Sequence, residues 1–394
     1  MKRSFNHLYI ILGAVLLQLS LGSIYSWTLF NEAIHYKYGW EFSNIIITYS
    51  LTISVFAFTT MFSGRLLDKF GARKIATIGG ILYGTGVMLT SRADTLLELY
   101  LYYGVIGGVG VGFAYVCPLA TAIKWFPKRK GLVAGIVVGA FGLGSLLFKS
   151  IIESSLNEIG LSNTFFRLGF IYLILSVTGA LLLSPPPKQK EELSNKTKNN
   201  KQHRVRDMVK TKNFYLIWIT YFLGCISGLL VIGSATEIGL VMAKVSFSQA
   251  AEAVVVIALF NATGRLFWGA ISDKIGCKLS LFIMFIITTI AMFLLTILNL
   301  NVLSLYLLLA FVAFGFGGFL VVYPTITSEY FGIENLGQNY GVIYQAYGIA
   351  ALFGPIIFKI AGSYVTTFLI SGSLSLLGAL LIVFIKRDQL IVKN

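Results

Sequence analysis

Long apolar runs constrain this sequence more than any other feature. Each is long enough to cross the roughly 30 Å apolar core of a bilayer, which takes about 20 helical residues. Only 12% of the 394 residues are charged, against about 25% in a soluble domain. We therefore predict an all-α integral membrane protein. Twelve transmembrane helices are expected, over 8–29, 44–66, 75–91, 97–118, 131–152, 165–184, 213–236, 251–271, 279–298, 302–323, 338–358 and 363–385.

The first run follows Lys2 and Arg3, an arrangement that also occurs in secretory signal peptides. It is too long for a typical signal core and has no small-residue cleavage site. It ends in YSWTLF, which is typical of an aromatic belt at a membrane interface. We therefore interpret it as the first transmembrane helix.

The basic residues fix the predicted orientation. If the N-terminus is cytoplasmic, most of the 31 Lys and Arg residues fall in cytoplasmic segments, which is the positive-inside pattern. The formal net charge of +15 then reflects topology, and no nucleic acid partner is needed to explain it. We predict a multi-pass protein of a bacterial plasma (inner) membrane, with both termini cytoplasmic.

One polar stretch interrupts the series of apolar runs. Residues 185–212 contain a run of prolines followed by many Lys, Asn and Gln residues, a composition that cannot build a core. We predict a cytoplasmic linker between two six-helix halves, 1–184 and 213–394. A solvated linker is one interpretation, and a regulatory surface that contacts anionic membrane lipid is the other.

The two halves contain a repeated motif. GRLLDKFGAR (64–73) aligns with GAISDKIGCK (269–278), and GLVAGIVVGAFGLG (131–144) aligns with GQNYGVIYQAYGIA (337–350). In the first pair an aspartate ends one helix, a glycine permits a tight turn, and basic side chains can bond a neighbouring helix end. We predict that each copy forms a conformational latch, made by Gly64, Asp68, Lys69, Gly71 and Arg73 in one and by Gly269, Asp273, Lys274 and Gly276 in the other.

With these motifs, the chain resembles the major facilitator superfamily over its whole length. Four segments are similar to the oxalate/formate antiporter family and its monocarboxylate-transporter relatives: YSWTLF (25–30), KWFPKRKGLVAG (124–135), GRLFWGAISDKIG (264–276) and NYG (339–341). The resemblance implies the major facilitator fold, with two pseudo-symmetric halves of six helices each. It also implies a transporter without a cofactor.

Arg265 stands out within an apolar span. It precedes Asp273, which marks the cytoplasmic interface, by eight residues or about 12 Å of helix, so we expect it near the bilayer midplane. An arginine there costs about 2.5–3.5 kcal/mol and needs a polar cavity or a partner. No carboxylate is expected at that depth, because Glu237 and Glu252 are placed near the outer helix ends. We therefore predict that Arg265 binds an anion, with Asn261 beside it; a purely structural arginine is the alternative.

The family resemblance supports this assignment and also departs from it. In oxalate/formate antiporters an arginine on helix 8 and a lysine on helix 11 hold the two carboxylates of oxalate. The arginine matches Arg265, but the position of the lysine is Tyr347. In monocarboxylate transporters an aspartate one turn before the arginine serves proton coupling, and that position is Asn261.

One fixed positive charge suits one carboxylate, so we predict secondary transport of a small monocarboxylate such as lactate, pyruvate or formate, by alternating access. A dicarboxylate exchanger and an anion sensor with a transporter fold remain as alternatives. Further substrate-binding candidates, which could instead be aromatic packing residues, are Tyr347, Tyr323, Gln345, Tyr344, Tyr25 and Trp27.

Other chemistries have little support in the sequence. The three cysteines, Cys117, Cys225 and Cys277, have neither metal-ligand nor disulfide spacing, so no metal is predicted. No nucleophile–base pair is visible among the three histidines, so we do not expect an enzyme. We expect a monomer whose partners are a small carboxylate anion and membrane lipid, with no nucleic acid.

Overall fold

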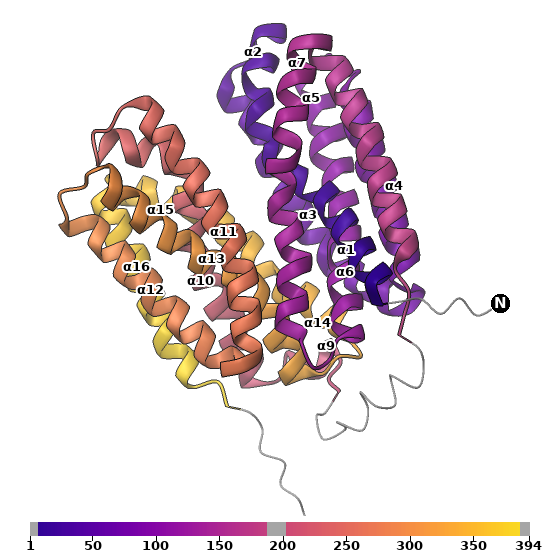
Figure 1. Ribbon diagram of the computed structural model, residues 1–394, viewed down its shortest axis with the longest axis vertical. Coiled ribbons are helices and arrows are strands. Elements are labelled where there is room, and N and C mark those ends of the chain that lie inside the picture. The colour runs from indigo at the N-terminus through magenta and orange to yellow at the C-terminus, as the bar shows by residue number, and fades with distance from the viewer. Residues whose placement is uncertain (1–6, 187–201, 387–394) are drawn as a thin grey trace, which may run out of the picture. The chain divides into compact units, whose positions relative to one another are not determined.

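The computed structural model describes residues 7–186 and 202–386, and every regular element in these ranges is helical (Figure 1). The predicted all-α class is confirmed. The linker prediction for 185–212 falls largely on residues 187–201, which lie outside the described residues. The elements are α1 (His7–Gly22), η1 (Ser23–Phe30), α2 (Asn31–Tyr38), α3 (Phe42–Phe70), α4 (Ala72–Thr90), α5 (Leu96–Leu99), η2 (Tyr100–Gly107), α6 (Gly108–Trp125), α7 (Lys130–Leu182), α9 (Val205–Met208), α10 (Lys212–Val241), α11 (Phe247–Ile275), α12 (Cys277–Ile297), α13 (Val302–Phe331), α14 (Leu336–Ile343), α15 (Gln345–Ala361) and α16 (Tyr364–Val383).

Within the described residues, 10 helical segments are long and apolar enough to span a membrane, and two features account for the difference from the predicted twelve. The first is α7, which runs through 53 residues and contains the two predicted spans 131–152 and 165–184. Gly160 interrupts it with a non-helical backbone (φ 74°, ψ 173°). The second is α4, whose mean hydropathy is lowered by Arg73 and Lys74 in its first turn.

The first span extends further than the sequence predicts. Its regular α-helix ends at Gly22, a 3₁₀ segment follows over Ser23–Phe30, and α2 continues the rod to Tyr38. The rod ends at Gly39, whose left-handed backbone (φ 70°) closes the helix in the usual glycine manner. The YSWTLF segment is therefore an internal part of this rod and not its end.

Contacts divide the chain into two compact units. Unit 1 comprises residues 1–127, 140–195 and 334–342, and unit 2 comprises 128–139, 196–333 and 343–394. The first residues of α7 thus group with unit 2, and most of α14 groups with unit 1. The predicted halves, 1–184 and 213–394, rest on the sequence repeat and stay a prediction.

Unit 1 is built around α6, which contacts α1, α3 and α4. Its core holds large buried aromatics, including Tyr83, Tyr115, Phe56 and Phe141. A Cβ on Gly110 would lie 2.3 Å from the backbone nitrogen of Tyr83. Only glycine permits this approach of α6 to α4, in the manner of small residues at membrane helix contacts.

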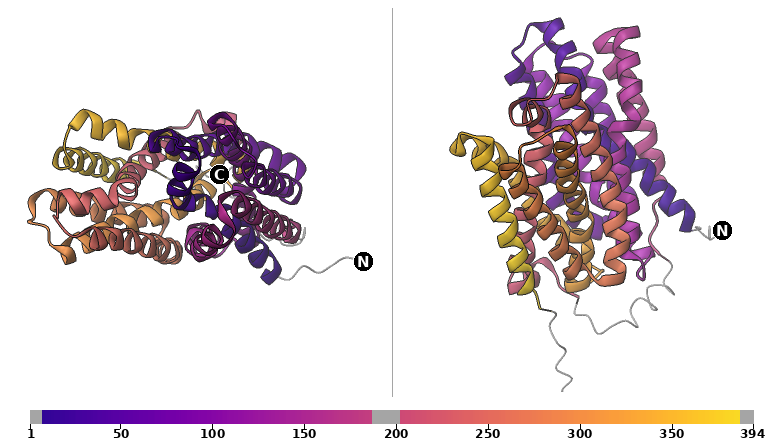
Figure 2. Two further views of the ribbon diagram at one scale, coloured as in Figure 1. Left: turned by 90° about the horizontal axis from the view of Figure 1, so that it is seen from above. Right: turned by 60° about the vertical axis from the view of Figure 1, so that its left-hand side comes forward.

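Unit 2 is built around α13, which packs against α10, α11 and α12. Its helices, coloured from rose to yellow, run alongside one another in Figure 2. Glycine permits a close approach of α11 to α13: a Cβ on Gly264 would lie 2.3 Å from the carbonyl oxygen of Phe314. This contact fixes the part of α11 that carries Arg265.

Candidate functional site

Arg265 lies in the middle of α11 and is 2% exposed. Its Nε donates a hydrogen bond to Oδ1 of Asn261, one turn earlier, at 2.9 Å. Its Nη1 donates to the carbonyl oxygen of Val138 on α7 at 2.6 Å. All three residues belong to unit 2. The guanidinium is thus oriented by two neutral oxygen atoms.

No carboxylate within the described ranges lies within 4.0 Å of this guanidinium. The two acids considered in the sequence are engaged elsewhere in unit 2. Glu252 accepts a hydrogen bond from Oη of Tyr306 at 3.0 Å, and Glu237 accepts one from Oη of Tyr364 at 2.5 Å. These tyrosines lie in the first turns of α13 and α16, at the helix ends away from Asp273. The positive charge of Arg265 is therefore not balanced by an acid among the described residues of this unit.

Gly317 on α13 makes room for this arrangement. A Cβ at this position would lie 2.1 Å from the carbonyl oxygen of Asn261 and 3.3 Å from Cγ of Arg265. The sequence reasoning did not identify Gly317 or the carbonyl of Val138 as parts of the site. The dense glycines of FGFGG (314–318) were the available signal for Gly317. The carbonyl of Val138 could not be predicted, because every residue carries a backbone carbonyl.

Three of the predicted tyrosines gather in unit 2 around a fourth that the sequence reasoning missed. Tyr221 on α10 stacks on Tyr323, with ring centroids 4.2 Å apart, and lies 6.4 Å from Tyr344. Tyr344 in turn stacks on Tyr347 at 5.1 Å. The four rings are at most 2% exposed. They form a buried tyrosine cluster, which we name by its members, Tyr221, Tyr323, Tyr344 and Tyr347.

This tyrosine cluster and Arg265 approach adjacent residues of α13. The ring of Tyr347 lies 6.5 Å from that of Phe316, the residue next to Gly317 on α13. Gln345, also predicted as a site residue, is half-buried beside Tyr344 at the start of α15. Unit 2 thus places one buried charge and several tyrosines along the same stretch of α13.

Tyr25 and Trp27 lie in the 3₁₀ segment η1 of unit 1, and the contacts just described join residues of unit 2 alone. Tyr25 is half-buried and meets Phe141 edge-on, with centroids 5.3 Å apart. Trp27 is 1% exposed, lies 4.4 Å from Tyr103, and stacks with Phe165. Trp27 therefore packs in an aromatic cluster of unit 1 rather than in an interfacial belt.

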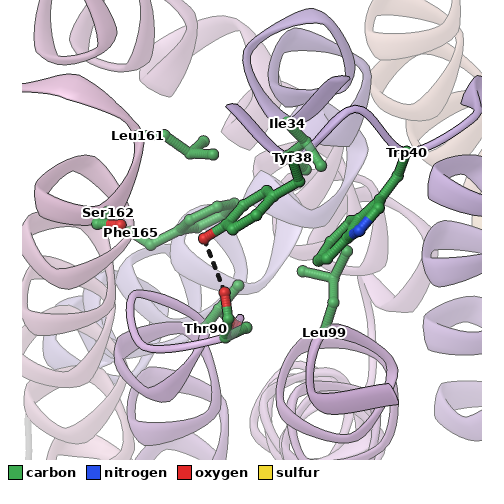
Figure 3. Close-up of a pocket in the computed structure, with 9 residues that line it drawn as sticks. Ile34, Tyr38, Trp40, Thr90, Leu99, Leu161, Ser162 and Phe165 are labelled. Atoms are coloured by element: carbon green, nitrogen blue, oxygen red, sulfur yellow. Dashed lines mark hydrogen bonds between the residues drawn. The ribbon is translucent and has the colours of Figure 1, made fainter. Parts of the chain in front are cut away.

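Phe165 also lines a small pocket beside Tyr38, the last residue of α2 (Figure 3). There Tyr38 stacks on Trp40 at 4.4 Å and donates a hydrogen bond to the carbonyl oxygen of Ala93 at 2.7 Å. The cavity measures about 10 Å³, which is space for a single water molecule. It is too small for a carboxylate substrate.

The latch motif of unit 2 bonds to the start of α7. Oδ1 and Oδ2 of Asp273 accept hydrogen bonds from the backbone N–H groups of Gly131 and Leu132, at 2.8 and 2.9 Å. A carboxylate at a helix N-terminus satisfies otherwise unpaired N–H groups and complements the helix dipole. Gly269 permits the approach, since a Cβ there would lie 2.4 Å from the carbonyl oxygen of Gly131.

In the predicted latch motif of unit 1 an aspartate again bonds to the start of a helix, and a lysine pairs with it. Asp68 accepts a hydrogen bond from the backbone N–H of Gln338, in the first turn of α14, at 3.2 Å. Lys124 pairs with Asp68 at 3.7 Å and donates to the carbonyl oxygen of Glu334 at 3.1 Å. Gly64 lies against Gly337, since a Cβ on Gly64 would be 2.1 Å from its carbonyl oxygen. Lys124 was missed because it lies outside the repeat.

The turn glycines and basic residues of the two motifs also match. Gly71 and Gly276 share one backbone conformation, with φ of 88° in both and ψ of 151° and 150°. Nε of Arg73 donates to the carbonyl oxygen of Leu183 at 3.0 Å, and Nζ of Lys278 donates to that of Val383 at 2.7 Å. Each therefore caps the C-terminal end of a helix.

The remaining basic residues of the motifs are placed differently. Nζ of Lys69 lies 5.1 Å from the ring centroid of Phe70, and Lys274 is exposed. Within the described part of the chain, neither donates a hydrogen bond to a neighbouring helix end.

The bonds of Asp273 can be tested through the amides that they protect. We expect Asp273→Asn to increase hydrogen exchange at the amides of Gly131 and Leu132 by roughly fivefold or more. The amide side chain carries no charge and can accept only one of the two bonds, and a carboxylate at a helix N-terminus contributes about 0.3–2 kcal/mol. Exchange mass spectrometry of detergent-solubilised protein gives the rates, with Lys274→Gln as the matched exposed control. Unchanged exchange in Asp273→Asn would show that these bonds contribute nothing.

The sequence profile of the Major Facilitator Superfamily matches residues 10–243 and 231–392. The chain belongs to the major facilitator superfamily. It is thus a multi-pass membrane transporter and not an enzyme, as predicted. Its fold matches the proton:xylose symporter XylE, with a TM-score of 0.75 at 17% identity, over 98% of this chain and 97% of that one.

Relatives within the superfamily refine the resemblance. The chain is 36% identical to the uncharacterized MFS-type transporter YhjX of Escherichia coli, over 87% of this chain and 85% of that protein. It is 29% identical to the oxalate:formate antiporter of Oxalobacter formigenes, over 88% and 82%. It is 25% identical to monocarboxylate transporter 12 of Xenopus laevis, over 83% and 77%. The predicted relationship to these two families is confirmed at the level of distant homology.

Proposed function

We propose that this major facilitator transporter carries a small monocarboxylate anion, such as lactate, pyruvate or formate, and that Arg265 binds its carboxylate. The observation that supports this most directly is the environment of Arg265. The guanidinium is 2% exposed and is held by the neutral oxygens of Asn261 and Val138, with no carboxylate near it among the described residues.

The energetics of a buried charge support an anionic substrate. A charged group away from water is costly unless it is paired, and the two neutral hydrogen bonds of Arg265 leave its net charge in place. A guanidinium has five N–H donors in a fork that matches a carboxylate, and its hydrogen bonds to the described residues use Nε and Nη1 alone. A bound carboxylate would balance the charge and use the remaining donors.

The single charge also favours a monoanion. Tyr347 stands where the related antiporters carry a lysine, and a tyrosine can offer one hydrogen bond but cannot balance a second negative charge. A dicarboxylate exchanger is the second candidate. The 29% identity to a protein named oxalate:formate antiporter favours it.

The latch motifs fit transport by alternating access. In our proposal, Asp68 and Asp273 hold the starts of α14 and α7 in one state and release them in another. We also propose that the protein lies as a monomer in a bacterial plasma (inner) membrane. Both of its termini would be cytoplasmic. The large share of Lys and Arg at the helix ends near these motifs supports this orientation.

Counterflow tests the proposal directly. Proteoliposomes loaded with unlabelled lactate, pyruvate, formate or oxalate are diluted into the same labelled anion, and transient accumulation is measured. We expect accumulation for at least one monocarboxylate and a weaker signal for oxalate. Saturable carboxylate binding without any flux would instead support an anion sensor, and the absence of both binding and flux would contradict the proposal.

A further inference from the structure

The segment that leads into α10, residues 203–211, is bonded to α13 at its start and to the first turn of α10 at its end. The backbone N–H of His203 donates to the carbonyl oxygen of Phe331, the last residue of α13, at 2.9 Å. The side chain of Met208, in the short helix α9, is fully buried. Thr211 caps α10 by accepting from the N–H of Phe214 at 3.2 Å, and its hydroxyl donates to the carbonyl oxygen of Met208 at 2.7 Å. Residues 203–211 therefore have a defined place at one end of unit 2.

This attached segment presents a cluster of positive charges. Its basic side chains are exposed, and none forms an ion pair with a described residue. Asp207 is the only acid between Gln202 and Phe214. Asn213 donates to the carbonyl oxygen of Lys386 at 2.8 Å, which brings a further exposed lysine to the same place. We call this cluster the basic patch; its members are Arg204, Arg206, Lys210, Lys212 and Lys386.

The position of the basic patch along the membrane normal follows from the helices beside it. Lys212 is the first residue of the α10 span, and Lys386 comes three residues after the end of α16. Next to them, Tyr215 and Phe384 are 55% and 58% exposed and belong to the apolar part of the surface. The charges thus lie where the apolar span ends, at headgroup depth, with a tyrosine at the interface as in other membrane proteins.

We propose that the basic patch binds the headgroups of anionic phospholipids. Four or more Lys and Arg residues directly beside a transmembrane helix attract the negatively charged headgroups of anionic lipids. The exposed Tyr215 and Phe384 lie beside the acyl chains of the same lipid molecules. Because His203 bonds to the last residue of α13, lipid bound there also restrains residues 203–211 against that helix end.

Lipid titration with native mass spectrometry tests this. Purified full-length protein in detergent is titrated with phosphatidylglycerol and with phosphatidylcholine, and the bound lipid is counted. We expect selective binding of phosphatidylglycerol. In the double variant Arg204→Gln/Arg206→Gln that affinity should fall by roughly thirtyfold, because two of the attracting charges are lost. Higher salt should weaken binding in the wild type.

Two control variants keep the result interpretable. Lys244→Gln/Lys359→Gln removes the same charge from exposed residues near the other ends of unit 2 helices and should bind lipid as the wild type does. Arg204→Lys/Arg206→Lys keeps the charge and should retain most of the binding, which separates electrostatics from misfolding. Equal binding of the two lipids, or unchanged phosphatidylglycerol affinity in Arg204→Gln/Arg206→Gln, would overturn the proposal. Neither result depends on which anion the protein carries.

Discussion

Replacing Arg265 by alanine is expected to reduce carboxylate uptake by roughly two orders of magnitude or more. Removing one partner of a buried, hydrogen-bonded charge pair costs about 2–5 kcal/mol, and Arg265 is the charged partner that the proposed substrate would meet. Insertion should not suffer, because an arginine within the membrane is itself unfavourable. Initial rates in proteoliposomes, normalised to reconstituted protein, give the comparison.

Two further variants on the same helix make this result specific. Arg265→Lys keeps the charge but loses the planar fork and should retain only weak transport. Thr263→Ala changes an exposed side chain that bonds the carbonyl of Leu259, and it should behave as the wild type. A well-inserted Arg265→Ala protein with normal uptake would show that this arginine is structural.

Tyr347→Lys is expected to reverse the preference between monoanions and dianions. A second carboxylate without a balancing charge costs several kcal/mol in a dry site, so the wild type should favour lactate, pyruvate or formate over oxalate. A lysine at this buried position supplies the missing charge. With a monoanion it leaves a surplus one, so oxalate transport should rise and monocarboxylate transport should fall, each by roughly tenfold.

Competition assays on both proteins measure this change. Tyr347→Phe is the matched control, because it keeps the ring contacts with Tyr344 and Phe316 but adds no charge. It should leave the order of substrates unchanged. If the wild type already takes oxalate as well as any monocarboxylate, the argument from a single charge fails.

The sequence predicted the helical class and the turn geometry of the repeated motif well because both depend on local patterns. Apolar length alone locates most spans, and the aspartate and glycine of each motif recur with the same backbone angles at Gly71 and Gly276. The helix ends were less accurate. Nothing in YSWTLF shows that the chain continues as 3₁₀ and α-helix to Tyr38, because an aromatic belt and an aromatic core contact have the same composition.

The site was predicted in part. Arg265 and Asn261 lie one helical turn apart, so their pairing could be expected from spacing, and the structure shows it. The carbonyl of Val138, the glycine at 317 and the stacking of Tyr221 on Tyr323 depend on which helices meet. Such long-range contacts leave no periodic signal in a single sequence.

The bonds made by the two latch aspartates have a consequence for how this protein tolerates sequence change. Asp273 accepts hydrogen bonds from the backbone N–H groups of Gly131 and Leu132, and Asp68 accepts one from the backbone N–H of Gln338. Every residue except proline offers such a group, so these bonds place no demand on the side chains of Leu132 and Gln338. As far as these bonds are concerned, the partner segments can change in sequence, provided that Gly131 and Gly337 stay small. A substitution at either aspartate instead removes the acceptor itself.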